Sequence, residues 1–130
     1  MAQPIEMILF RQLATSLALP VWLLDPEGEL VFFNEAAERI LGRRFHESNP
    51  LHIADMAETF HMILENGDPL PPEELVLAFR AAMVHPLHRE MGFNGVDGRY
   101  HPIEVTAFPL VGHRGVAMGV VAMFWERVSS

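Results

Sequence analysis

The chain has 130 residues, half of them hydrophobic, which suffices for one domain with a hydrophobic core and excludes a disordered tail. Its formal net charge of −8 and the lack of a Lys/Arg run argue against nucleic-acid binding. The absence of cysteine excludes disulfides and thiolate metal sites. No stretch approaches the ~20 apolar residues of a membrane span, and no signal peptide is evident, so we expect a cytoplasmic protein.

The first predicted element is an amphipathic helix from Pro4 to about Leu17. Pro4 suits the first helical position, and Leu19-Pro20 ends the helical pattern. One apolar stripe follows the helix at every fourth position: Ile5, Leu9, Leu13 and Leu17.

A short hairpin and a second helix come next. Val21–Leu24 is an apolar run of strand formers, and Asp25–Gly28 has the Asp, Pro and Gly of a tight turn. Leu30–Phe33 is predicted to be the return strand. Asn34 stands where its side chain can cap the following helix, which Gly42 is expected to end in the left-handed conformation.

The middle of the chain predicts two further helices. Asp55 begins an analogue of a capping box, which predicts a helix over Met56–Glu65. Pro72 at a first helical position predicts the longest interior helix, which extends to about Val84. Pro86 closes it, because the residue before a proline avoids the helical region.

Three strands are predicted to complete the chain. A turn at Asn94–Arg99 precedes the strands His101–Leu110 and Gly115–Trp125. Both alternating residue sets of the last strand are apolar, so the sheet should be covered on both faces. The N-terminal helix is the expected cover of the second face, either within a monomer or together with a second subunit. Since large exposed apolar patches usually mark interfaces, we expect a homodimer.

The hairpin that leads directly into an Asn34-capped helix resembles the opening of a PAS domain. The Asp97-Gly98 turn, and the strand with Pro109 near its end, resemble the second half of that family. The resemblance covers about Leu17 to Arg127. It implies an α+β fold, with a five-stranded antiparallel sheet and helices packed on one face. It also implies a sensory or protein-interaction module in signal transduction.

Under this resemblance the chain divides into an N-terminal dimerisation or capping helix, residues 1–17, and a PAS domain, residues 18–130. The implied partners are a second copy of the chain and an output domain or partner protein. No output motif is present in the 130 residues. The chain is therefore expected to be either a module of a longer protein or a freestanding protein that acts in trans.

The resemblance further implies a ligand pocket between the inner face of the sheet and the interior helices. Together with strand parity, it places seven apolar positions on that face: Trp22, Leu24, Ile103, Val105, Ala107, Gly119 and Val121. Such a lining suits a small apolar ligand, and a filled core without a ligand is the simpler alternative. Flavin pockets of the family typically carry Asn or Gln side chains, and Val121 stands where such a Gln would lie.

The chain has seven histidines, a residue type that can ligate haem iron or a metal ion. Haem-binding members of the family use a His on the long interior helix. Here His85 lies at the end of that helix, and the family's ligand position falls nearer Met83, so haem ligation by His85 is kept only as an alternative. No metal-site pattern is present, and the sequence requires no cofactor. The lack of cysteine excludes the covalent flavin and chromophore chemistries of the family.

No enzyme activity is expected. The sequence offers no convincing nucleophile, base and orienting group, and Glu104 is predicted by strand parity to point away from the pocket. Three hypotheses of different class are retained: a ligand sensor, an interaction or homodimerisation module, and a small enzyme on a similar curved-sheet fold.

Overall fold

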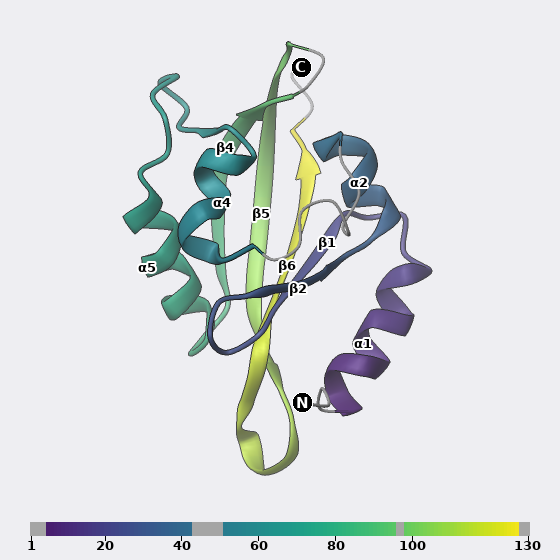
Figure 1. Ribbon diagram of the computed structural model, residues 1–130. Coiled ribbons are helices and arrows are strands. Elements are labelled where there is room, and N and C mark those ends of the chain that lie inside the picture. Colours follow the sequence, from purple (N-terminus) through teal and green to yellow (C-terminus); the bar gives the residue numbers. More distant parts are fainter. Residues whose placement is uncertain (1–4, 43–50, 96–97, 128–130) are drawn as a thin grey trace.

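A computed structural model describes residues 5–42, 51–95 and 98–127. Its centre is a six-stranded antiparallel sheet with the strand order β2-β1-β6-β5-β4-β3 (Figure 1). The elements are, in chain order, α1 (Ile5–Thr15), β1 (Val21–Leu24), β2 (Leu30–Phe33), α2 (Glu35–Leu41), α4 (Ile53–Thr59), β3 (Met62–Ile63), α5 (Pro72–Ala82), β4 (Leu87–Asn94), β5 (Tyr100–Val111), η1 (His113–Gly115) and β6 (Ala117–Glu126). The predicted α+β class is confirmed, and the sheet has one strand more than predicted.

The predicted hairpin and capped helix are confirmed at the predicted residues. Asn34 caps α2 through its side-chain oxygen, which accepts a hydrogen bond from the Ala37 amide at 3.0 Å. Gly42 ends α2 in the left-handed conformation, with φ of 75°. In the turn, the Asp25 carboxylate accepts from the amides of Glu27 and Glu29, as expected for an Asp in this position.

The prediction of a helix over Met56–Glu65 was wrong at both ends. Helix α4 begins earlier because His52, rather than Asp55, caps it: the His52 Nδ1 accepts from the Ala54 amide at 3.0 Å. The helix ends at Thr59, and His61 takes a positive φ of 52°. This reversal directs Met62–Ile63 into the sheet as β3, beside Phe93 and Gly92 of β4. The sixth strand therefore depends on pairing with a distant strand, which local patterns do not report.

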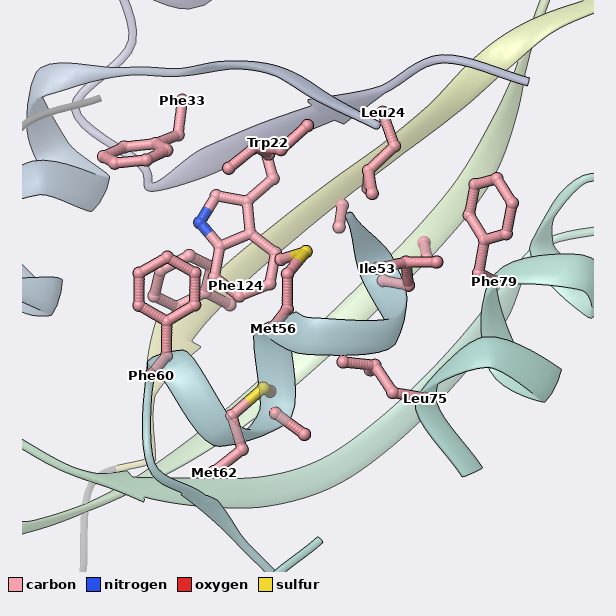
Figure 2. Close-up of a cluster of buried hydrophobic side chains, with 14 of the residues drawn as sticks. Trp22, Leu24, Phe33, Ile53, Met56, Phe60, Met62, Leu75, Phe79 and Phe124 are labelled. Carbon is pink, nitrogen blue, oxygen red and sulfur yellow. The ribbon is translucent and has the colours of Figure 1, made fainter. Parts of the chain in front are cut away.

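The main hydrophobic core lies between one face of the sheet and the helices α4 and α5. It contains side chains from all six strands together with α4 and α5, among them Trp22, Phe33, Met56, Phe79 and Phe124. Figure 2 shows these side chains converging from the sheet and from the two helices. Helix α5 begins at Pro72, as predicted, and buries Leu75, Phe79 and Ala82 on one side.

Helix α1 covers the other face of the sheet within the same chain. Its buried Met7 and Ala14 pack with Val21, Leu23 and Val121 of β1 and β6. Figure 1 places α1 on the side of the sheet opposite to α4 and α5. The expectation that both faces of β6 are covered is therefore confirmed. In the part of the chain that the structure describes, no helix is long and apolar enough to cross a membrane.

The predicted α1 stripe does not face the sheet. Ile5, Leu9 and Leu13 are 67%, 57% and 59% exposed, whereas Leu17 packs against the cluster beneath α1. The helix therefore has two apolar sides. One side, built on Met7 and Ala14, packs on the sheet, and the other faces solvent in the single chain.

Candidate ligand cavity

A small cavity lies in the main core between α5, α4 and the inner face of the sheet. The space open to the centre of a water-sized sphere measures about 50 Å³. Its walls come from five strands and two helices: Trp22, Leu24, Ile53, Met62, Leu75, Ala78, Phe79, Ala82, Leu87, Arg89, Met91, Val105, Ala107, Val120 and Ala122. In Figure 2, Leu75 and Phe79 of α5 and Ile53 of α4 approach the cavity from the helix side, opposite Trp22 and Leu24 of β1.

Four of the seven predicted pocket residues line this cavity, namely Trp22, Leu24, Val105 and Ala107. Ile103 is buried in the same core without bordering the cavity. These positions follow from strand register: Leu87 and Arg89 on β4 lie opposite Ala107 and Val105 on β5, so their side chains share one face.

The predicted inward positions on β6 were wrong. Val121 packs against α1 on the opposite face, and the inward residues are its neighbours Val120 and Ala122. Gly119 has the same parity as Val121 and lies against the β1 backbone, where a Cβ atom would fall 2.3 Å from the Leu24 carbonyl oxygen. Because both alternating sets of β6 are apolar, parity in the sequence cannot distinguish the two faces.

The residues of α5 that line the cavity were not predicted from the sequence. Leu75, Phe79 and Ala82 follow one another at spacings of four and three residues, which is the pattern of one helical face. This periodicity in Pro72–Ala82 could have predicted them, because the buried side of an interior helix must face the sheet that it covers.

The cavity lining is apolar apart from Arg89, and the size of the cavity limits what it can hold. A volume of 50 Å³ corresponds to roughly four water-sized groups, since one water needs about 10–15 Å³ on this measure. That is room for a short hydrocarbon chain, and it is about a third of the roughly 150 Å³ of an apolar cavity that binds benzene. A flavin or haem does not fit the residues present, because the cavity is far too small and its described lining offers no Asn or Gln for a flavin and no His for a haem iron.

Trp22 is the central side chain of the site. It is 5% exposed, and its ring centroid lies 5.1 Å from that of Phe124 and 5.7 Å from that of Phe60. Its indole Nε1 is buried and has no hydrogen-bond partner among the described residues. An unsatisfied buried donor of this kind costs about 1–3 kcal/mol. In Figure 2 the nitrogen lies on the side of Phe33 and Phe60, away from Phe79.

The alternative haem ligand, His85, lies outside the cavity. It follows the end of α5, is exposed, and its Nδ1 lies 3.2 Å from the Pro86 carbonyl oxygen. Met83, nearer the family's ligand position, is half-buried and packs against the core. Across residues 5–42, 51–95 and 98–127, no three His, Asp or Glu side chains are grouped so that they could hold a metal ion.

Apart from Arg89, the polar side chains of the sheet around Glu104 lie away from the cavity. Glu104 points to the opposite face, as predicted, where its Oε1 lies 3.1 Å from His88 Nε2 and its Oε2 accepts from Trp125 Nε1 at 3.2 Å. Nearby, Arg127 donates to Glu65 at 3.0 Å and lies 3.1 Å from Glu90. The hydrogen bond from Arg127 lowers the pKa of Glu65, and the same bond raises the pKa of Arg127.

Comparison with known proteins gives a family match and a set of similar folds. A family model described as a PAS domain matches residues 8–82, more than half of the chain. No curated protein matches the chain significantly.

Three solved structures illustrate the similarity of fold. The PAS domain of Bordetella pertussis BvgS has a TM-score of 0.65 and 13% identity, over 95% of this chain and 87% of that one. The Rhodobacter sphaeroides LOV protein has a TM-score of 0.72 and 14% identity, over 98% and 70%. A Vibrio cholera VqmA–ligand–DNA complex has a TM-score of 0.68 and 16% identity, over 96% of this chain and 52% of that chain.

Proposed function

The chain belongs to the PAS domain family, and from this premise we propose that it is a sensory domain in signal transduction that binds a small apolar molecule. The cavity beneath Trp22 carries the proposal. It lies in the middle of the main core, its lining is apolar apart from Arg89, and Trp22 and Phe79 border it from opposite layers. Empty apolar space in a packed core lowers the free energy of unfolding. A cavity in the middle of this core therefore favours a ligand-binding role.

Strand β1 provides a physical route from the cavity to α1. Trp22 and Leu24 border the cavity, and their neighbours Val21 and Leu23 pack beneath α1 on the other face. A ligand that displaces Trp22 therefore acts on the strand that supports α1. Such a switch requires that the ligand binds one arrangement of β1 and α1 more tightly than another.

The exposed stripe of α1 supports a second function, homodimerisation. Ile5, Leu9 and Leu13 expose more than half of each side chain on one side of a helix whose other side is already packed. Apolar residues gathered in this way favour an interface, and a second copy of the same helix offers a matching apolar surface. The signal would then pass from the cavity through α1 to the second subunit or to an output partner.

Native mass spectrometry of freshly purified protein, paired with an absorbance scan from the ultraviolet through the visible, tests the ligand proposal. We expect a small organic molecule that adds mass without a haem or flavin band. A variant that fills the cavity, Ala82→Leu, should lose the added mass. Ala81→Leu, one residue away on α5 and outside the cavity lining, is the matched control. An apo mass for the wild type, together with failure of small apolar probes to bind, would overturn the ligand proposal and leave dimerisation as the function.

A further inference from the structure

Among the described residues, Arg89 is the only charged one that lines the cavity. It lies on β4 opposite Val105, so its side chain leaves the strand on the inner face of the sheet. The residue is nevertheless exposed, as expected for a long side chain whose stem covers apolar surface while its guanidinium reaches water. The open side of the cavity lies between α5 and β4. It is bordered there by the exposed Arg89 and by Ala78 and Leu87, which are half-buried.

The guanidinium of Arg89 has no hydrogen bond or ion pair within the described part of the chain. Two carboxylates share a surface groove with it, those of Glu65 and Glu90, but both are held by Arg127, at 3.0 and 3.1 Å. The chain has 17 acidic and 9 basic residues, and within residues 5–42, 51–95 and 98–127 none of the carboxylates forms an ion pair with Arg89. Its position at the open side of an apolar cavity matches an anionic group on a ligand.

We infer that the ligand is a small amphipathic carboxylate, whose short chain fills the cavity and whose carboxylate binds Arg89. This inference rests on the proposed ligand-binding function and adds the chemical class of the ligand. The cavity admits only roughly four water-sized groups, which sets the size of the apolar part. Arginine presents paired N–H donors that match the two oxygens of a carboxylate, and it is charged at any physiological pH.

The indole N–H signals of the two tryptophans provide an internal readout. Trp22 lines the cavity, whereas the Trp125 indole donates to Glu104 on the opposite face. Titration with hexanoate and with 1-hexanol, followed by two-dimensional ¹H–¹⁵N NMR, compares probes that share an apolar chain and differ in charge. We expect both probes to shift the Trp22 signal and leave that of Trp125 in place, and hexanoate to bind about fivefold more tightly.

Substitution of Arg89 isolates the charge. In Arg89→Gln the preference for hexanoate should disappear while the affinity for 1-hexanol stays within about twofold. Arg80→Gln is the matched control, because Arg80 is an exposed cation on α5 that does not line the cavity, and it should keep the preference. The preference should also weaken with added salt, as expected for a partly exposed ion pair.

The outcomes separate this inference from the proposed function. If neither probe shifts Trp22, the ligand-binding proposal fails and the inference fails with it. If 1-hexanol binds as tightly as hexanoate, or if Arg89→Gln keeps the preference, ligand binding stands and the assignment of a carboxylate to Arg89 is overturned.

Discussion

The side-chain amide of Asn34 donates to the backbone carbonyl of Ala14, at 3.0 Å, across 20 residues of sequence. The same amide group donates to the Leu19 carbonyl at 2.9 Å. On its other side, the Asn34 oxygen accepts from the amides of Val21 and Ala37, both at 3.0 Å. One buried side chain therefore joins the end of α1, the start of β1 and the first turn of α2. The position of α1 on the sheet depends on this junction.

Asn34→Ala should lower the free energy of unfolding by about 3 kcal/mol, because several backbone groups lose their partner in a buried site. Urea denaturation of the variant and the wild type measures the change. Asn66→Ala is the control, since Asn66 is exposed and bonds only within its own turn, to Asp68. It should cost less than about 1 kcal/mol. Equal losses in the two variants would contradict the junction role of Asn34.

Gly119→Ala should destabilise the protein more than a glycine substitution at an open turn. At Gly119 the backbone has φ of 158°, and an added Cβ would fall 2.3 Å from the Leu24 carbonyl oxygen. β1 and β6 would have to separate locally, at a cost of about 2–4 kcal/mol. Gly67 has φ of 92° and no atom within 4 Å of an added Cβ, so Gly67→Ala should cost only about 1 kcal/mol. Thermal denaturation of both variants tests the order, and the reverse order would refute the close approach of β1 and β6.

The ion pair between Glu65 and Arg127 predicts a pH dependence of stability. Arg127 lowers the pKa of Glu65 from its ordinary value of 4.5, so folding favours the charged carboxylate. The resulting stabilisation is present above 4.5, the ordinary value, and is lost as the pH falls through the lowered pKa of the folded state.

Denaturation midpoints measured from neutral pH to well below 4.5 should show this loss for the wild type. In Glu65→Gln the loss of stability at low pH should be smaller by the contribution of Glu65, so the midpoint should change less with pH than in the wild type. Glu73→Gln removes one exposed carboxylate near the start of α5 without touching Arg127, and it should follow the wild-type profile. A Glu65→Gln profile parallel to that of the wild type would show that the ion pair contributes nothing measurable.

The combined substitution Leu9→Asp and Leu13→Asp tests the proposed dimer. Charges in the exposed α1 stripe should raise the dissociation constant of the dimer at least about tenfold, since they would be buried without partners. Sedimentation measures the mass, and far-UV circular dichroism checks that the fold is kept. The matched control is Leu77→Asp with Val84→Asp, two residues that are 62% and 77% exposed away from α1. A stripe variant that keeps the mass of a dimeric wild type would exclude this helix as the interface.

Local chemistry made much of the first half predictable. The turn at Asp25, the cap at Asn34 and the stop at Gly42 each depend on a residue type whose side chain or backbone freedom acts on its own neighbours. Such interactions span a few residues, so a sequence window contains all of their parts. The same holds for the start of α5 at Pro72.

The cavity was only partly predictable. Inward positions on β1 and β5 followed from alternation, and Trp22, Leu24, Val105 and Ala107 all border the cavity. On β6 the alternation carries no information, because both faces are apolar, and Val121 lies beneath α1. The sequence did not predict Arg89 as a residue of the cavity lining, since a charged residue on a strand is expected to face water.

From the sequence alone, short-range bonds and the balance of apolar and polar residues predicted the hairpin, the Asn34 cap and the need to cover both faces of the last strand. The class of fold was implied by the resemblance of these motifs to the PAS family. Only the folded arrangement shows that Met62–Ile63 joins the sheet, which side of β6 faces the cavity, and that Arg89 borders the cavity at its open side. Each of these depends on pairing or packing between segments far apart in the chain, where a partner's position, and no local preference, sets the outcome.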